Sequence, residues 1–109
     1  MSDCLFCQIV SGNVSAQIVA QTDSLIAFQD IHPQAPKHVL IIPKEHIESA
    51  KTISQTQSAL IGQMVLLAQE LNPERDFRLT INAGVEAGQS VFHLHMHVLS
   101  GRSFSWPPG

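Results

Sequence analysis

Hydrophobic and polar residues follow two different periods along the chain, and the longer period predicts a helix. Between Ser54 and Leu71, apolar residues recur every three or four positions, as they do on one face of an amphipathic helix. The apolar positions are Leu60, Ile61, Met64, Val65, Leu67, Ala68 and Leu71. Asn72 and Pro73 should end this helix, because proline cannot continue the backbone hydrogen bonds and disfavours helical geometry in the residue before it.

Four shorter apolar segments predict β-strands. Residues 25–28 and 39–42 are β-prone runs separated by turn-forming residues, and residues 77–81 alternate apolar and polar side chains. The fourth strand is expected over residues 91–99, with its even-numbered residues in the core. Together these elements predict an α+β domain, in which the helix covers one face of an antiparallel sheet and leaves the other face for a site.

The composition is that of a folded chain. Of the 109 residues, 44% are hydrophobic and 14% are charged, which excludes disorder and predicts a single domain over residues 1–109. The formal net charge of −3, with scattered lysines and arginines, offers no basic stripe for a nucleic-acid polymer or an anionic membrane. The apolar runs are strand-sized and the first residues lack a targeting signal, so a cytoplasmic location is expected.

Three histidines, His93, His95 and His97, occupy alternate positions on the fourth strand. In an extended strand, this spacing places successive imidazoles about 7 Å apart on one face. A hydrated polar face would explain one such histidine, but three in register suggest chemistry. Neutral imidazole is available near pH 7 and can attack phosphorus to form a labile N–P bond, which divides a difficult displacement into two easier ones.

The loop before this strand contains Gly88, Gln89 and Ser90. A glycine there lets backbone N–H groups approach phosphate oxygens, and the Ser90 hydroxyl offers a donor to a leaving group. A hairpin turn explains the same glycine equally well. The few residues that separate the loop from the histidines favour the phosphate-binding interpretation.

Both cysteines lie in the segment Cys4-Leu5-Phe6-Cys7. A disulfide that closes so short a loop gains little, so the spacing favours a metal site or a redox pair, and a reducing cytoplasm suits either. Two buried thiols acting as small hydrophobic side chains are a further interpretation. The redox interpretation lacks a preceding strand and the usual flanking residues.

Residues 88–99, Gly-Gln-Ser-Val-Phe-His-Leu-His-Met-His-Val-Leu, resemble the signature of the histidine triad superfamily. Other segments resemble its nucleotide-binding branch in particular, namely Asp30-Ile31, Pro33-Gln34-Ala35-Pro36, His38, Ile42-Pro43-Lys44-Glu45-His46 and Trp106-Pro107-Pro108-Gly109. Together they cover almost the whole chain. The resemblance implies the histidine triad fold, an antiparallel sheet of about five strands with one long and one short helix.

The resemblance assigns catalytic roles to four residues. His95, the middle histidine, matches the nucleophile that becomes nucleotidylated, and His97 matches a residue that holds phosphate oxygens. Ser90 matches the hydroxyl near the leaving group. His38 matches a histidine that supports the catalytic cluster from a neighbouring strand.

A purine nucleotide pocket is also implied. Asp30 matches the carboxylate that accepts from the ribose hydroxyls, although an aspartate in a turn often bonds its own backbone. Leu5, Phe6 and Ile31 match the apolar slot for the base, with ordinary core packing as the alternative. Solvated surface is the alternative for the residues that match polar organisers of the phosphate site, Asn82 and Gln89.

The cysteine pair resembles that of zinc-binding members of the superfamily. Together with two histidines it supplies a complete set of four ligands, Cys4, Cys7, His46 and His93. Zinc favours tetrahedral coordination by two cysteines and two histidines, and a closed site of this kind is structural. We therefore expect one Zn²⁺ that fixes the strand carrying the nucleophile while His95 stays free.

The function implied is hydrolysis of nucleoside 5′-monophosphate derivatives, such as adenosine phosphoramidates, without a redox cofactor. A dinucleoside polyphosphate hydrolase is the enzymatic alternative, and a nucleotide-binding regulatory or scaffold protein is the alternative from another class. The low charge, the small size and the resemblance predict a homodimer, with Trp106 of the tail reaching towards the partner's site.

Overall fold

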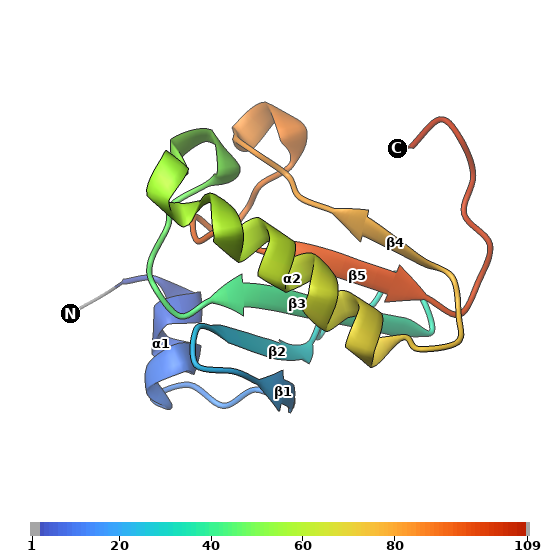
Figure 1. Cartoon of the computed structure of the whole chain (residues 1–109), viewed down its shortest axis with the longest axis horizontal. Coiled ribbons are helices and arrows are strands. Elements are labelled where there is room, and N and C mark those ends of the chain that lie inside the picture. The colour runs from blue at the N-terminus through green and yellow to red at the C-terminus, as the bar shows by residue number, and fades with distance from the viewer. Residues whose placement is uncertain (1–2, 109) are drawn as a thin grey trace.

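The computed structural model describes residues 3–108, which form a five-stranded antiparallel sheet flanked by helices (Figure 1). The strands lie in the order β1-β2-β3-β5-β4. Their bounds are β1 Ile18–Gln21, β2 Leu25–Gln29, β3 Lys37–Pro43, β4 Phe77–Thr80 and β5 Met96–Ser100. The helices are α1 Leu5–Ser11 and α2 Ser58–Leu71, with short 3-10 turns at η1 Ala50–Thr52, η2 Gln55–Gln57 and η3 Val85–Ala87. The predicted α+β class, with one long and one short helix, is confirmed.

Helix α2 lies across one face of the sheet, as its apolar spacing predicts (Figure 1). Its buried residues are Met64, Leu67 and Ala68. The helix ends at Leu71 as predicted, but it begins at Ser58 rather than Ser54. The Ser54 N–H donates to the side-chain oxygen of Gln57 over 2.9 Å, and this contact closes the first predicted turn as η2. Within residues 3–108, no helix has both the length and the hydropathy needed to cross a membrane.

The opposite face of the sheet is covered in part by α1. Phe6 and Ile9 are buried there against a second core formed by Ile26, Phe28, Leu40 and Ile42. The helix is capped by the Cys4 Sγ, which accepts a hydrogen bond from the Cys7 N–H over 3.4 Å. Gly12 ends it with a φ of +85°, a conformation that favours glycine. Because α1 is short, it leaves part of this face open.

The prediction of a strand over residues 91–99 is correct only for its C-terminal half. Residues 91–95 belong to no strand, and β5 begins after them. Phe92, which should be in the core, is 41% exposed. The Leu94 N–H donates over 2.6 Å to the carbonyl of Ile47, which follows β3, and this bond takes the segment out of the regular ladder. The alternation predicts correctly the burial of the other three core positions, Leu94, Met96 and Val98.

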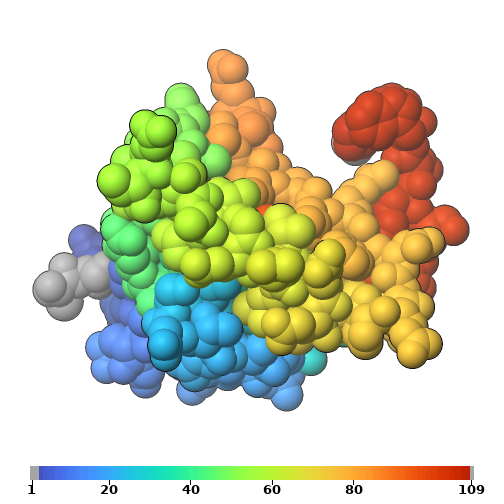
Figure 2. Space-filling model, viewed as in Figure 1, coloured from blue at the N-terminus to red at the C-terminus, as the bar shows by residue number. Residues whose placement is uncertain are grey.

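The C-terminal segment leaves the body of the molecule as a separate arm (Figure 2). Its base is held by Arg78, whose guanidinium donates to the Ser105 carbonyl over 2.8 Å. The guanidinium groups of Arg78 and Arg102 also lie 4.9 and 4.2 Å from the centroid of the Phe104 ring, within the range of cation–π attraction. Trp106, beyond these contacts, is 83% exposed.

We expect Met64→Ala to destabilise the fold by about 2–5 kcal/mol, because Met64 is fully buried between α2 and the sheet and the truncation leaves a cavity. The measurement is the free energy of unfolding, obtained from a urea titration that is monitored by circular dichroism. Gln69→Ala, at an exposed position of the same helix, is the matched control and should change that free energy by less than about 0.5 kcal/mol. Equal effects of the two substitutions would show that Met64 is not a core residue.

Candidate active site and metal cluster

A cavity of about 400 Å³ opens on the face of the sheet that α1 partly covers. Residues predicted from the sequence to be functional contribute to its lining, namely Leu5, Phe6, Asp30, Ile31, Asn82, Ser90, His95 and His97. His38 and Gln89 are not among the lining residues, and both are buried. The structure therefore brings most of the predicted catalytic and nucleotide-binding residues to one cavity.

Sequence reasoning missed several residues at the apolar end of this cavity. These are Ile9, Val14, Ala16, Phe28 and Leu40, together with the polar residues Ser15, Gln29 and His32. Phe6 and Ile9 have the spacing of a helix face, but α1 is too short for that spacing to be read as a helix from the sequence. An aromatic ring with aliphatic walls suits a flat base, and Ile31, which is 85% exposed at this end, is available to cover one.

His95 lines the cavity with only 6% of its surface exposed. Its ring packs edge-on against Phe6, with 5.2 Å between the centroids. The His95 Nδ1 lies 2.8 Å from the backbone carbonyl of His93. Since a carbonyl oxygen can only accept, Nδ1 carries the proton and donates it to this bond. The Nε2 atom of the neutral ring therefore keeps its lone pair, which is the state that a nucleophile requires.

A chain of hydrogen bonds determines the tautomer of His97 in the same way. The Gln34 N–H donates to His38 Nδ1 over 3.0 Å, so the proton of neutral His38 lies on Nε2. That Nε2–H donates over 2.9 Å to His97 Nδ1. Neutral His97 must then carry its own proton on Nε2. The ring of His97 thus brings an N–H donor, rather than a lone pair, to the lining of the cavity.

Burial keeps both rings of this chain neutral at physiological pH. The pKa of His97 falls from 6.5 to about 4, chiefly because of burial, with smaller contributions from the nearby His95 and His38, while Asp30 opposes the shift. Burial also lowers the pKa of His38, again against the opposing influence of Asp30. The donor arrangement that ends on His97 is therefore the one present near pH 7.

Asp30 makes a turn contact and also lines the cavity. Its Oδ1 accepts a hydrogen bond from the His32 N–H over 2.8 Å, which is the turn contact expected of an aspartate. Its Oδ2 lies 3.4 Å from His38 Nε2, and the residue lines the cavity. The turn contact fixes the carboxylate at the edge of the site and leaves it accessible from the cavity.

The loop before the histidines is held by its own hydrogen bonds. The Gln89 side chain is 4% exposed, accepts from the Gly84 N–H, and donates to the carbonyls of Glu48 and Val91. The N–H groups of Gly88 and Gln89 donate to carbonyls within the same turn. The glycine at 88 has a φ of +96°, as a turn requires. The turn interpretation therefore accounts for these N–H groups, and the Gln89 side chain organises the loop from behind the cavity.

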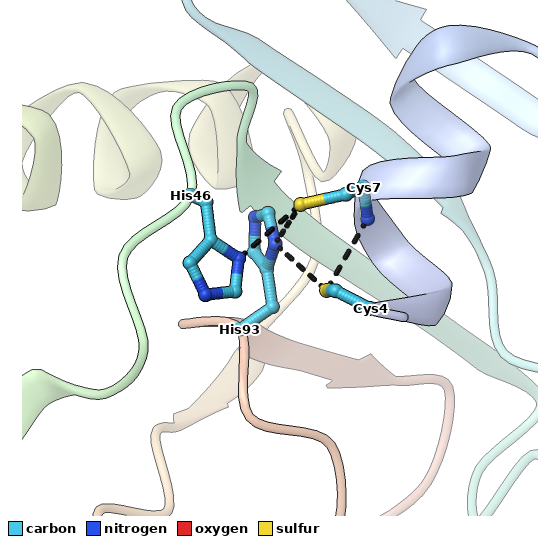
Figure 3. Close-up of side chains that lie close together, drawn as sticks. All are labelled: Cys4, Cys7, His46 and His93. Carbon is cyan, nitrogen blue, oxygen red and sulfur yellow. Dashed lines mark hydrogen bonds between the residues drawn. The ribbon is translucent and has the colours of Figure 1, made fainter. Parts of the chain in front are cut away.

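A second group of side chains lies beside the cavity, where α1 meets the residues that follow β3 and precede β5 (Figure 3). One ligand atom of each of Cys4, Cys7, His46 and His93 lies within 4.8 Å of all the others. The His93 Nδ1 is 3.4 and 3.5 Å from the two sulfurs, and the His46 Nδ1 is 3.2 Å from Cys7 Sγ. A tetrahedral zinc with ordinary bond lengths separates its sulfur and nitrogen ligands by about 3.6 Å, so these residues fit a zinc ion.

The protonation of His93 agrees with this fit. Its Nε2–H donates to the Pro43 carbonyl over 2.8 Å, so Nδ1 turns its lone pair towards the two sulfurs. A backbone acceptor on the far nitrogen is the usual arrangement for a histidine that binds a metal. Burial lowers the pKa of His93 and thereby favours the neutral ring, although the bond to Pro43 acts in the opposite direction and His46 and His95 lower it further.

A third group, formed by Asp30, His38 and His97, also brings potential ligand atoms together. Its hydrogen bonds argue against a metal. The Gln34 N–H occupies His38 Nδ1, so His38 Nε2 holds a proton instead of a lone pair. The 2.9 Å between His38 Nε2 and His97 Nδ1 is a hydrogen-bond distance, and the proton of that bond lies between the two nitrogens that a shared metal ion would need. This group is therefore a hydrogen-bond chain that determines the tautomers of His38 and His97.

Comparisons with known proteins identify a family model, a relative and solved structures that this chain resembles. A family model described as scavenger mRNA decapping enzyme C-term binding matches residues 3–105. A HIT-like protein of Synechocystis sp. is 45% identical, over 98% of this chain and 97% of the relative. The crystal structure of a HIT family hydrolase from Legionella pneumophila has a TM-score of 0.94 and 40% identity, over 98% of this chain and 100% of that one. A HIT family hydrolase from Clostridium thermocellum has a TM-score of 0.92 and 38% identity, over 96% of both chains.

The extent of these matches leaves no large part of the chain outside the shared fold. The alternating histidines that the sequence placed in one motif lie in that fold, with His95 and His97 at the cavity and His93 at the metal cluster. The chain belongs to the histidine triad (HIT) superfamily.

Proposed function

We propose that this protein hydrolyses nucleoside 5′-monophosphate derivatives through a covalent intermediate on His95. The observation that carries the proposal is the 2.8 Å hydrogen bond from His95 Nδ1–H to the His93 carbonyl, which leaves a nucleophilic lone pair on Nε2 in a residue of the cavity wall. The HIT family hydrolases from Legionella and Clostridium support hydrolysis as the reaction type. The resemblance to the nucleotide-binding branch favours adenosine phosphoramidates as the substrates.

In the first step, His95 Nε2 attacks the α-phosphorus and a new N–P bond forms. The bond between phosphorus and the leaving nitrogen breaks, and the amine leaves with a proton that the Ser90 hydroxyl, exposed at the cavity, is suited to relay. Attack makes the His95 ring cationic, and the His93 carbonyl stabilises that charge through the Nδ1–H bond. The His97 Nε2–H donates to a non-bridging oxygen, where negative charge accumulates.

In the second step, water attacks phosphorus and the N–P bond breaks. The electron pair returns to His95 Nε2, the water oxygen becomes part of the released monophosphate, and its proton passes to solvent. His95 returns to its starting tautomer without a proton transfer through the buried Nδ1. The same ring therefore serves both steps.

The rest of the cavity would hold the nucleotide. The apolar end, with Leu5, Phe6 and Ile31, suits a purine base, and the Asp30 carboxylate suits the ribose hydroxyls. Asn82 lines the cavity with Ser90 and offers an amide to the phosphate. These assignments place the base on the α1 side and the leaving group towards the Ser90 loop.

We further propose that the cluster of Cys4, Cys7, His46 and His93 binds one Zn²⁺. The sulfur–nitrogen separations and the Nδ1 lone pair of His93 support this metal, as does the preference of zinc for two thiolates and two imidazoles. Bound zinc would supply a rigid link between α1 and the histidine segment. The zinc has no part in the bond-making steps.

The protein is proposed to act as a homodimer. Within residues 3–108, β4 forms an edge of the sheet with a single neighbouring strand, and an unpaired edge favours association. Trp106 stands on the C-terminal arm with 83% of its surface exposed, and a large aromatic side chain gains most from burial against a partner. These two features support the dimer and the reach of the tail towards a second copy.

Substitution of His95 tests the covalent step. His95→Ala should lower kcat for adenosine 5′-phosphoramidate by at least about a thousandfold, because no other lone pair replaces Nε2. Intact mass spectrometry after acid-free quenching should detect a nucleotidyl adduct on the wild type and none on the variant. His97→Gln should slow turnover yet leave the adduct detectable. An adduct that persists in His95→Ala would remove His95 from the mechanism.

Metal analysis tests the zinc site. Protein purified without chelator should contain about one zinc per chain, and Cys4→Ser and His46→Ala should reduce this content well below one. Ser103→Ala, an exposed residue outside the cluster, is the control and should keep the wild-type content. A wild type that contains no metal, and whose stability and activity do not change when zinc is added, would show that these four residues form no metal site.

Analytical ultracentrifugation tests the dimer. The wild type should sediment as a dimer at micromolar concentration, and Trp106→Ala should weaken association if the tail contacts the partner. A monomer at that concentration contradicts the proposal. Because the arm lies outside the core, circular dichroism of Trp106→Ala should match the wild type, which separates lost association from lost folding.

A further inference from the structure

We propose that His93 is a positioning residue through which metal binding sets the orientation and tautomer of the His95 nucleophile. This inference builds on the proposed zinc site and the proposed role of His95. Its basis is a juxtaposition within one residue. The side chain of His93 belongs to the metal cluster, and its backbone carbonyl accepts the 2.8 Å hydrogen bond from His95 Nδ1–H.

The sheet does not position this carbonyl. The backbone pairing of β5 with β3 begins at Met96, and the pairing with β4 begins at His97. Residues 91–95 lie outside the strands, so no ladder of backbone hydrogen bonds holds them. The nucleophile and its hydrogen-bond acceptor thus stand on an irregular segment, although they precede the most regular part of the sheet.

Contacts with the end of β3 and with the segment that follows it take the place of the ladder. The Leu94 N–H donates to the Ile47 carbonyl over 2.6 Å, and the buried Leu94 side chain packs in the main core. The His93 ring donates to the Pro43 carbonyl over 2.8 Å. These contacts attach the segment at Leu94 and at one side of the His93 ring.

Without a metal, the ring is held at Nε2 by the Pro43 bond and at Nδ1 only by thiol contacts of 3.4 and 3.5 Å, which are weaker than a bond to a metal ion. A metal bound to Nδ1 adds a second fixed point on the opposite side of the ring, because Cys4, Cys7 and His46 hold the ion from other parts of the chain. Two attachments on opposite sides of the ring restrict its movement, and because the ring is joined to its own backbone they also restrict the movement of the His93 carbonyl. The carbonyl then keeps the proton of His95 on Nδ1.

A different role for the metal predicts different kinetics. The cysteines flank Phe6, and Phe6 lines the base end of the cavity. If the ion acted only by fixing α1, its loss would weaken nucleotide binding and raise KM. Action through His93 instead lowers kcat, because it changes the state of the nucleophile and leaves the buried Phe6 packed in its core.

The test compares His46→Ala with His46→Cys. His46→Ala removes a ligand from the exposed side of the cluster, whereas His46→Cys supplies a thiolate that completes a set of three cysteines and one histidine, which zinc also accepts. We expect His46→Ala to lose zinc and to lower kcat for adenosine 5′-phosphoramidate by about 10- to 100-fold. Its KM and its Kd for AMP should stay within about twofold of the wild type. His46→Cys should restore zinc content and recover most of kcat.

Two measurements that need no turnover report on the positioning itself. In ¹⁵N-labelled protein, the His95 ring signals of the wild type should show one tautomer, protonated at Nδ1, and His46→Ala should show a mixture. Hydrogen exchange at the amides of residues 93–95 should accelerate in His46→Ala, while exchange in α2 stays unchanged. Zinc added to the chelated wild type should reverse both changes.

The outcomes separate this inference from the proposed function. Zinc loss that raises KM and leaves kcat and the His95 signals unchanged would overturn the positioning role, as would a wild type that binds no zinc. An inactive wild type in which zinc still controls the His95 tautomer would refute the proposed substrate while supporting the coupling. A general rise in hydrogen exchange across α2 would show that zinc supports the whole fold instead of this segment.

Discussion

Three buried histidines, His38, His93 and His95, each have one ring nitrogen fixed by a backbone group, and this constraint determines what the other nitrogen can do. A neutral imidazole has one donor and one acceptor nitrogen, so a single fixed partner settles both. The carbonyls of Pro43 and His93 accept from His93 Nε2 and His95 Nδ1, which leaves lone pairs on the opposite nitrogens. The Gln34 N–H does the reverse for His38. Backbone geometry thereby distinguishes a metal ligand, a nucleophile and a donor.

This constraint depends on the fold because two kinds of backbone supply the partners. The strand β3 is buried along most of its length and holds His38 and the Pro43 carbonyl in a rigid ladder between β2 and β5. The carbonyl of His93 comes from an irregular segment, where local contacts replace the ladder. The fixed strand therefore positions the supporting groups, and the irregular segment presents the reactive one.

The sequence predicted the parts of the molecule that depend on side-chain periodicity. The spacing of α2, its end before Pro73 and the burial of Leu94, Met96 and Val98 all follow from it. It could not predict that the last strand begins only at Met96, because the Leu94 N–H donates to the carbonyl of Ile47, which lies 47 residues away in the sequence. The position of helix α1 was not predicted from the sequence, for another reason. Seven residues give too few turns for a periodic signal, although this helix carries Phe6 and two potential metal ligands.

The sequence predicted which residues gather at the site better than it predicted which ring nitrogen of each histidine carries the proton. The motif of alternating histidines treats His93, His95 and His97 as equivalent, and residue types alone make Asp30, His38 and His97 as plausible a metal site as the cysteine cluster. The difference lies in backbone groups that no motif records. An acceptor at the far nitrogen of His93 turns a lone pair towards the thiols, whereas a donor at the far nitrogen of His38 turns a proton towards His97. Two groups of similar ligands beside one cavity thus have opposite chemistry, because a carbonyl stands behind one and an N–H behind the other.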